Sequence, residues 1–268
     1  MSRKRWEAET YHSKDFDWDK LREEVEKNPK FQFHFLPFSK VVTQLEEAQR
    51  DSEAWDRFHA RHSTGKFFKE RRYLLKEFPE LASCEDNSKV LEVGCGNGST
   101  ALPILWYFLD DPVDLRCFSC PCYEALERTK EIITASTSIS AIHRFHPFLC
   151  DFSTTGFPSW LASNTCSESS FNGHCLGSLE AYEAYAGANS DEAKSCIGGV
   201  DFVTLIFTLS ALPLDRMPKA IKECFDILKP GGMLLFRDYG ICDMTMLRFD
   251  PQQRIGWNTI LFLLLGYC

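Results

Sequence analysis

The stretch from Lys89 to Thr100 constrains the fold of this chain more than any other part. It begins with an apolar run, contains an acid at Glu92, and then places small residues at alternate positions: Gly94, Gly96 and Gly98. Residues 101–109, which follow, are almost wholly apolar. This order predicts a strand, a tight turn and a buried helix.

Two physical reasons explain glycine in such a turn. The backbone must adopt φ > 0 there, which residues with a side chain rarely do. A ligand must also approach bare backbone, with the N–H groups at the helix start pointing at it. We therefore expect a cofactor pocket at this turn, and a purely structural turn is the alternative.

The spacing of the glycines distinguishes two kinds of cofactor pocket. The fingerprint of nicotinamide-binding proteins would place its third glycine at position 99, where this chain has Ser99. Gly-x-Gly-x-Gly after an acid-bearing strand instead resembles motif I of the class I S-adenosylmethionine (SAM) methyltransferases. This resemblance implies that Glu92 and the backbone of residues 94–98 face the methionine and ribose end of SAM.

Composition bounds the class of protein and its compartment. A length of 268 residues suits one α/β domain plus an appendage, and the apolar fraction is ample for a packed core. The chain has twelve cysteines, and its N-terminus does not resemble a secretory signal. These two features predict free thiols in a reducing compartment, the cytosol or the nucleus. Three of them are close together (Cys117, Cys120 and Cys122), but no second Cys/His pair has a convincing spacing, so we expect no metal site.

Charge and hydropathy limit the partners. The net charge of −8 argues against a general nucleic-acid coat, although a local basic face is compatible with it. The apolar tail at 260–265 is far shorter than the roughly 20 residues that a membrane-spanning helix needs. We therefore expect no membrane segment.

The first 80 residues are expected to form an N-terminal helical extension. Residues 1–37 resemble a partly ordered arm, with a short helix at 19–27. Between residues 57 and 78, cations alternate with aromatic residues, a mixture suited to phosphate contact and base stacking in RNA. The alternative is an amphipathic helix whose apolar side packs on the next domain.

Residues 81–268 are expected to form the catalytic domain. Strands are predicted at 89–93, 114–118 and 143–150, and within 200–212 a fourth strand is predicted that runs into a loop. A turn at 229–232 is predicted to lead into a fifth strand at 233–240, and further helices are predicted at 123–135 and 217–228. Residues 154–199 are rich in Ser, Ala, Gly, Asn and Cys, which predicts a low-complexity surface insertion.

Residues at the ends of the second and third strands are candidates for the rest of a cofactor site. In methyltransferases the second strand normally ends in an acid that grips the ribose hydroxyls, but this chain has Cys120 there, which cannot accept two charge-assisted bonds. Asp151 follows the third strand, where it is expected to accept a hydrogen bond from the exocyclic amine of the adenine of SAM. Phe152 is expected to line the face of the adenine ring. Capping of a helix start is the alternative role for Asp151.

Several further motifs resemble, in order, the methyltransferase-like tRNA 3-methylcytidine family between about 48 and 254. They comprise Trp55-x-x-Phe58, Phe67-Phe-Lys-Glu-Arg71, the glycine turn, Asp151, residues 205–211, Phe236-Arg-Asp-Tyr-Gly240 and Met246-Leu-Arg-Phe249. The resemblance implies an α/β, Rossmann-like class I methyltransferase sheet, SAM as methyl donor and tRNA as substrate. It also implies a cytidine in the anticodon loop as acceptor and, in some members, a seryl-tRNA synthetase partner. Cofactor-binding residues implied in addition to those above are Trp55, Phe58, Arg71 and Ile206.

The chemistry of the proposed reaction fits the residues near the last strands. N3 of cytosine already has a lone pair, so transfer depends on alignment more than on a strong base. Phe207, Phe236 and Tyr239 are candidate stacking surfaces, and Asp238 is expected to orient the cytosine amine and offset the charge that develops on the ring. An internal Arg237–Asp238 ion pair is the alternative.

The end of the chain departs from the family. Family members continue with more strands, whereas residues 255–268 form an atypical tail, so the sheet is expected to lack its last strands. We hypothesise that residues 259–265 cover the apolar edge left at 233–236. A second hypothesis for function follows: a catalytically impaired scaffold, or a truncated form of such an enzyme, that keeps tRNA or synthetase binding without effective SAM binding.

Overall fold

The structure is a computed structural model. It describes residues 17–35, 70–83, 87–96, 98–107, 114–119, 123–136, 144–162, 197–240, 242–243, 246–248, 254–256 and 259–260. Trp55, Phe58 and Cys120 lie outside them, as do most of the basic and aromatic segment and residues 163–196.

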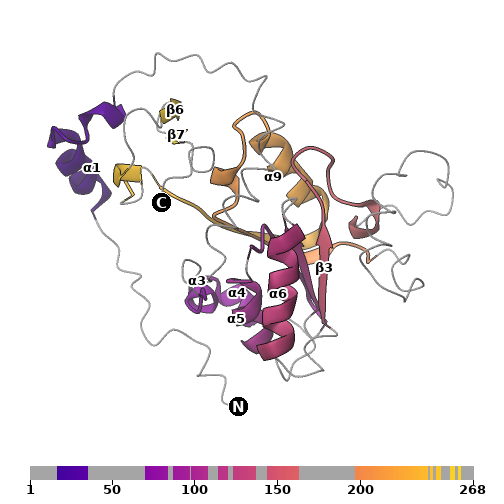
Figure 1. Cartoon of the computed structure of the whole chain (residues 1–268). Coiled ribbons are helices and arrows are strands. Elements are labelled where there is room, and N and C mark those ends of the chain that lie inside the picture. The colour runs from indigo at the N-terminus through magenta and orange to yellow at the C-terminus, as the bar shows by residue number, and fades with distance from the viewer. Residues whose placement is uncertain are drawn as a thin grey trace.

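A five-stranded sheet organises the described residues, with helices on both faces (Figure 1). Its spatial order is β3-β2-β1-β4-β5, and every neighbouring pair is parallel. The strands are β1 (Lys89–Val93), β2 (Asp114–Ser119), β3 (Phe145–Leu149), β4 (Val200–Ile206) and β5 (Leu228–Arg237). The chain leaves β1 toward β2 on one side and returns to pair with it through β4 on the other. In open parallel sheets ligands bind beyond the strand ends at this reversal point.

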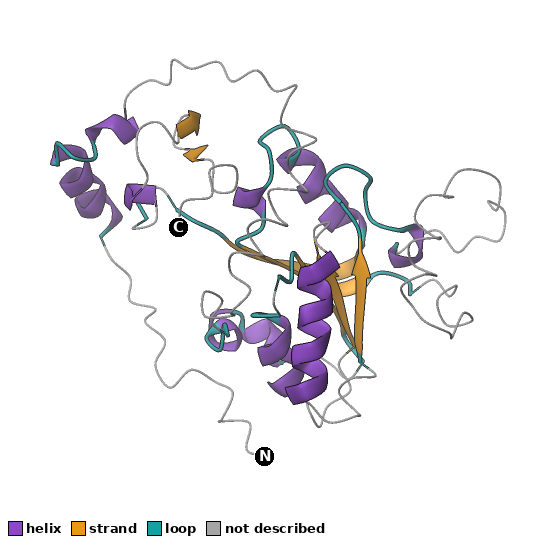
Figure 2. Ribbon diagram, in the orientation of Figure 1, coloured by secondary structure: helices purple, strands orange, loops and turns teal. Residues whose placement is uncertain are grey.

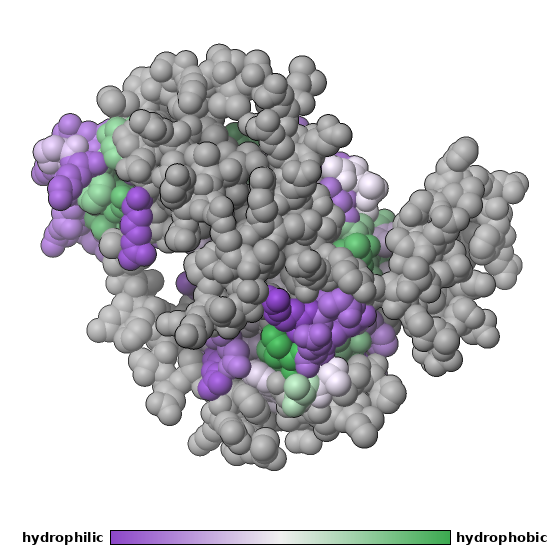
Figure 3. Space-filling view, in the orientation of Figure 1, coloured by the Kyte–Doolittle hydropathy of each residue, from purple (hydrophilic) through white to green (hydrophobic). Residues whose placement is uncertain are grey.

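The helices form two layers on opposite faces of the sheet (Figure 2). One layer contains α3 (Leu74–Glu77), α4 (Pro79–Ala82), α5 (Ala101–Tyr107) and α6 (Tyr123–Ser136). The other contains α9 (Met217–Asp226) and the short 3-10 helix η4 (Ser159–Leu161). On the face shown in Figure 3, the outward side of α6 is mostly hydrophilic, whereas its Leu126 and Ile133 are buried. The α/β fold expected from the sequence is confirmed.

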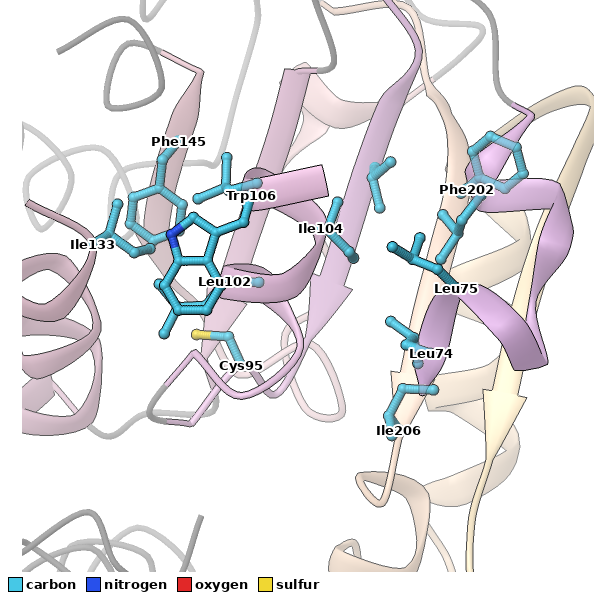
Figure 4. Packing of buried hydrophobic residues seen from close by; sticks show 14 of the residues in the cluster. Leu74, Leu75, Cys95, Leu102, Ile104, Trp106, Ile133, Phe145, Phe202 and Ile206 are labelled. Atoms are coloured by element: carbon cyan, nitrogen blue, oxygen red, sulfur yellow. The ribbon is translucent and has the colours of Figure 1, made fainter. Parts of the chain in front are cut away.

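Each face of the sheet has its own hydrophobic cluster. The first joins α3 to α6 with the strands, and in Figure 4 Leu74 lies beside Ile206 while Trp106 lies near Ile133 and Phe145. The second cluster packs α9 and η4 against the other face, around Phe152 and Leu161. Because α3 is part of the first cluster, residues from before the predicted domain boundary at 80 contribute to the core. The two-domain division stays a prediction.

The predicted elements agree with the structure apart from their ends. Strands β1, β2 and β3 and helices α6 and α9 differ from the predicted ranges by two residues or fewer at each end. Within 200–212, β4 ends at Ile206, and the predicted loop contains the 3-10 helix η6 (Leu209–Ala211). The turn predicted at 229–232 forms an irregularity inside β5, where Gly231 has φ of 84°.

Near the N-terminus, α1 (Trp18–Lys27) confirms the short helix predicted at 19–27. The Asp17 side chain accepts a hydrogen bond from the backbone N–H of Lys20 and so caps the helix start. The 3-10 helix η2 (Gln32–Phe35) follows it.

Both ends of the predicted insertion belong to the folded core. Leu161 is fully buried, and the backbone N–H of Ile197 donates to the carbonyl of Trp160 at 2.9 Å. Residues 154–162 therefore differ from the expected surface excursion, because their apolar side chains pack on the sheet. The hydrogen bond joins the described chain before residue 163 to the described chain after residue 196.

The tail adds no strand to the large sheet within the described residues. Strands β6 (Arg254–Gly256) and β7 (Thr259–Ile260) pair with each other in a separate antiparallel ribbon. The hypothesis that the tail adds a substitute strand to the 233–236 edge is therefore wrong for 259–260, and 261–265 lie outside the described residues. Met233 and Phe236 remain 38% and 48% exposed. None of the described helices combines the length and apolar character needed to cross a bilayer.

Candidate functional site

The glycine turn has the backbone geometry that its sequence predicts. Gly94, Gly96 and Gly98 all have positive φ, at 74°, 50° and 75°. The N–H of Gly98 donates to the carbonyl of Cys95 at 2.8 Å, and its own carbonyl accepts from Leu102 at 2.9 Å. The turn therefore leads directly from the end of β1 into α5.

Two threonine side chains occupy the space that a Cβ atom at Gly94 or Gly98 would need. A Cβ added to Gly94 would lie 2.7 Å from Oγ1 of Thr208, and one added to Gly98 would lie 2.9 Å from Cγ2 of Thr129. The hydroxyl of Thr208 donates to the carbonyl of Val93 at 2.9 Å. Packing within the protein, rather than approach of a ligand, thus explains why glycine is needed at 94 and 98.

Glu92 is the most unusual polar group near the turn. Only 1% of its surface is exposed, and neither carboxylate oxygen has a hydrogen-bond partner in the described residues. Burial raises the pKa of Glu92 to about 7, although Arg71, the hydroxyl of Thr100 and the N–H of Ala101 all act to lower it. These groups are close, but none makes a hydrogen bond of good geometry with the carboxylate. A ligand that brings a cation or an N–H group would stabilise the ionised form.

Arg71 connects the turn to the neighbouring strand ends. Its backbone N–H donates to the carbonyl of Ser99 at 2.8 Å, and its Nη1 donates to the hydroxyl of Thr100 at 2.6 Å. The same guanidinium lies 5.4 Å from the centre of the Phe207 ring, within cation–π distance. One side chain therefore spans the predicted donor and acceptor sites.

Phe207 and Tyr239 form an aromatic pair beyond the ends of β4 and β5. Their ring centres are 4.7 Å apart with a 40° tilt. Phe207 is half-buried and Tyr239 is 36% exposed, so the pair presents ring surface to a ligand. Phe207 has φ of 54°, a strained conformation that proteins retain mainly at functional sites.

Asp238 lies next to this pair, and backbone groups hold its carboxylate. Oδ2 accepts from the N–H of Ser210 at 2.9 Å, and Oδ1 accepts from the N–H of Tyr239 at 2.8 Å. The alternative of an Arg237–Asp238 ion pair is wrong, because Arg237 pairs with Glu77 instead. The fixed, half-buried carboxylate remains available to a further donor.

The residues predicted to hold adenine are placed differently from one another. The Oδ1 atom of Asp151 accepts from the N–H and the hydroxyl of Ser153, at 3.2 and 2.7 Å, so this side chain stabilises its own turn. Phe152 is fully buried and stacked on Phe157, with ring centres 5.2 Å apart. Its ring therefore offers no face to a cofactor in this structure, contrary to our expectation. Ile206 is also buried, where it packs in the first core cluster.

The remaining predicted ligands for a cofactor or metal are only partly described. Trp55, Phe58 and Cys120 lie outside the described ranges, and nothing about the side chain of Cys117 is described. Where the structure describes side chains, no group of three or more His, Cys, Asp or Glu residues is arranged to hold a metal ion. Four cysteines in the described parts are free thiols: Cys95, Cys150, Cys224 and Cys242.

Sequence reasoning missed several residues that shape the site. Thr208 and Thr129 pack on the turn, and Tyr73 and Glu77 contact Arg237. The only local signal was for Thr208, a polar residue just beyond a buried strand. The other contacts join distant parts of the chain and leave no spacing pattern.

Comparison with known proteins gives one family match that covers most of the chain. The family described as "Methyltransferase domain" matches residues 67–257. Among solved structures, the PH0226 protein of Pyrococcus horikoshii covers 65% of this chain and 59% of its own, with 12% identity and a TM-score of 0.41.

Three curated relatives have closely related names. The chain is 32% identical to the "tRNA N(3)-cytidine methyltransferase METTL6" of Homo sapiens, over 81% of this chain and 64% of that protein. It is 32% identical to the "tRNA N(3)-methylcytidine methyltransferase Mettl2" of Drosophila melanogaster, over 77% and 53%. It is 33% identical to the "tRNA N(3)-methylcytidine methyltransferase trm140" of Schizosaccharomyces pombe, over 76% and 54%. The chain thus spans just over half to under two thirds of the length of these relatives.

Proposed function

Because this chain belongs to the methyltransferase domain family, we propose that it transfers a methyl group from SAM to N3 of a cytidine in tRNA. The names of its relatives support the reaction and the substrate. The observation that carries the proposal is a juxtaposition. A buried carboxylate that accepts no hydrogen bond from the described residues and an aromatic pair lie on neighbouring strand ends, and Arg71 contacts both the glycine turn and that pair.

The residues around the turn fit SAM as the cofactor. No described group donates a hydrogen bond of good geometry to Glu92, and the amino group of the methionine part of SAM would supply one. The turn that contains Gly94, Gly96 and Gly98, all at positive φ, follows directly after the strand that carries Glu92. When bound, SAM supplies an electrophilic methyl group on its sulfonium sulfur.

The strand ends fit an unpaired pyrimidine as the acceptor. The exposed surface of the Phe207–Tyr239 pair stacks the flipped base, because base stacking on aromatic rings contributes roughly 1–3 kcal/mol. The Asp238 carboxylate accepts from the cytosine amine and offsets the positive charge that the ring acquires on N3 methylation. Since N3 has a free lone pair, these residues act by alignment and electrostatics and need not remove a proton first.

The finer details of the proposal concern where and with whom the chain acts. A base in the anticodon loop suits this reading, because unpaired loop bases can be flipped onto aromatic rings. Arg72, which forms an ion pair with Glu70, and Lys76 flank Tyr73 in the chain and suit phosphate contact. A seryl-tRNA synthetase partner and a place in the cytoplasm or nucleus belong to the same proposal.

A tRNA-binding scaffold without effective SAM binding is the second candidate. Two observations favour it: Phe152 is turned into the core, and the position expected to carry the ribose-binding acid is Cys120. Calorimetry with SAM separates the two candidates. No detectable heat at millimolar SAM would favour the scaffold, and Cys120→Asp would then be expected to restore binding.

The test of the proposed function is methyl transfer to RNA. The chain is incubated with methyl-labelled SAM and total tRNA, and the digested nucleosides are separated. We expect the label in 3-methylcytidine for the native chain and almost none for Asp238→Asn. Label in another nucleoside, or none while SAM still binds, would overturn the assignment.

A further inference from the structure

The side chain of Arg237, at the end of β5, lies between residues of the N-terminal part of the chain and the site. Its guanidinium is 4.8 Å from the centre of the Tyr73 ring and 5.9 Å from that of Phe207. Its Nη1 forms an ion pair with Oε2 of Glu77. We name these residues, Tyr73, Glu77 and Arg237, the arginine clamp.

Helix α3 fixes the position of two clamp residues. Tyr73 and Glu77 are four residues apart, so they lie on the same side of this single turn. Leu74 and Leu75 anchor the turn from the other side, where they are buried and pack near Ile206 and Phe202 (Figure 4). Packing in the core thus presents a ring and a carboxylate to the end of β5.

Contacts with Arg237 also hold Phe207 in its strained backbone conformation. Its backbone N–H donates to the carbonyl of Arg237 at 2.8 Å, while its ring contacts the Arg237 and Arg71 guanidinium groups. A non-glycine residue with φ of 54° costs of order 1–3 kcal/mol, so its surroundings must hold it there. Arg237 contacts this residue through both its backbone and its side chain.

The ion pair is shielded enough to have an effect. The Glu77 side chain is 20% exposed and that of Arg237 is 34% exposed, in contrast to pairs such as Lys222–Asp226, at 72% and 52%. Fully exposed pairs contribute little because solvent screens them. A planar guanidinium can also contact a carboxylate and two rings at once, whereas a lysine ammonium cannot.

We propose that Arg237, held by Tyr73 and Glu77, is a positioning residue that fixes the Phe207 ring in the orientation required to receive the acceptor base. This inference rests on the proposed function, because the base is the ligand that the ring receives. Arg237 acts through Phe207 and does not contact the reacting atoms. The clamp also makes the segment before β1 a structural part of the acceptor site.

The first experiment measures steady-state kinetics of the whole chain with tRNA and SAM. We expect Glu77→Gln and Arg237→Gln each to lower kcat about tenfold to a hundredfold, because a small misplacement of a reacting group has effects of this size. The KM for SAM should change less than twofold. Arg237→Lys should recover part of the rate, and the double variant should be no slower than Arg237→Gln alone. The matched control is Lys222→Gln, which breaks an exposed pair on α9 and should leave kcat unchanged.

The second experiment observes the ring itself and does not depend on activity. With 4-fluorophenylalanine at position 207, the fluorine NMR spectrum should show one sharp resonance, which Glu77→Gln or Arg237→Gln broadens or splits. Lys222→Gln should leave it unchanged.

The outcomes separate the two proposals. If the native chain transfers no methyl group but the resonance responds to the clamp variants, the proposed function fails and the positioning of Phe207 stands. If methyl transfer occurs and both kcat and the resonance ignore the clamp variants, the positioning role is wrong. If the clamp variants lower both thermal stability and rate but leave the resonance unchanged, the positioning role is also wrong, because Arg237 would then be merely structural.

Discussion

The turn after β1 and the ends of β4 and β5 lie at the same edge of the sheet, but the carboxylates in these two regions differ in their hydrogen bonding. At the turn, Glu92 is buried and accepts no hydrogen bond from the part of the chain that the structure describes. At the strand ends, Asp238 already accepts two backbone hydrogen bonds, while Tyr239 exposes its ring. In the first region the nearby donors make no well-formed hydrogen bond to the carboxylate, and the second region offers a flat apolar surface.

This difference teaches what each region can bind. A buried carboxylate without a donor gains most from a compact cation with N–H groups, such as an amino acid ammonium. A pre-arranged carboxylate beside exposed rings gains most from a planar base with an amine at its edge. The two regions therefore suit different ligands, and Arg71 lies between them. The following predictions separate the two regions experimentally.

The largest expected effect is on the stability of the turn. Gly94→Ala should lower the free energy of unfolding by about 4 kcal/mol, because strain at positive φ and a clash with Thr208 add together. Gly231→Ala is the matched control, since φ there is also positive but nothing lies within 4 Å of the added Cβ; it should cost only about 1 kcal/mol. Urea denaturation measures both, and equal effects would show that Thr208 does not pack as described.

The next effect is a pH dependence of stability that arises from Glu92 in the turn. Because the pKa of Glu92 is raised to about 7 from 4.5, the folded chain holds its proton more tightly than the unfolded chain. Stability should therefore fall by up to about 3 kcal/mol as the pH rises from about 4.5 to 7. Glu92→Gln should remove this fall, whereas Glu80→Gln, an exposed carboxylate on α4, should keep it.

Ligand binding offers an independent check on Glu92. The demethylated product of SAM retains its amino group, so its binding near pH 7 should release protons as Glu92 ionises. Calorimetry in buffers of different ionisation enthalpy measures that release. Product binding by Glu92→Gln with unchanged affinity would contradict the role given to this carboxylate.

At the strand ends, Asp238→Asn should lower the rate of methyl transfer and leave the affinity for SAM unchanged. We expect kcat to fall about a hundredfold, because the charge that offsets the methylated ring is lost. SAM affinity should stay within twofold, which calorimetry can establish. Asp215→Asn, an exposed acid before α9, is the control, and a fall of less than threefold for Asp238→Asn would remove Asp238 from the mechanism.

The smallest effect should come from the exposed ring. Tyr239→Leu should raise the KM for tRNA about tenfold, since it removes part of one stacking surface. The affinity for SAM should not change. Phe225→Leu is the control, because Phe225 is an exposed aromatic residue on α9. An unaltered KM would mean that the base does not stack on Tyr239.

The sequence predicted the elements of the fold because their signals are local. Apolar runs gave the strands, the spacing of apolar residues gave α6 and α9, and the glycines predicted the positive φ values after β1. The candidate residues Glu92, Arg71, Phe207, Asp238 and Tyr239 lie near the strand ends for the same reason, because each belongs to or flanks a recognisable strand or motif. Their roles in binding and catalysis stay predictions.

What the sequence did not predict depends on contacts between distant residues or on side-chain direction. Phe152 follows Asp151, but adjacent side chains in the turn point differently, and Phe157 stacks on the ring from inside. Glu77 and Arg237 are 160 positions apart, a pairing that no local periodicity encodes. The direction of Phe152 and the pairing of Arg237 thus become visible only after the sheet and α3 are placed together.

The hydrogen bond between Ile197 and Trp160 has a consequence for how this protein tolerates change. This bond holds the described chain on either side of residues 163–196 together beside the sheet, so we expect the core to tolerate a change in the length of that connection. Each doubling of a flexible loop costs only about 0.6 kcal/mol of closure entropy. A short glycine–serine bridge, a foreign peptide or a fluorescent tag that replaces residues 163–196 and keeps the buried Leu161 should leave the strand ends undisturbed.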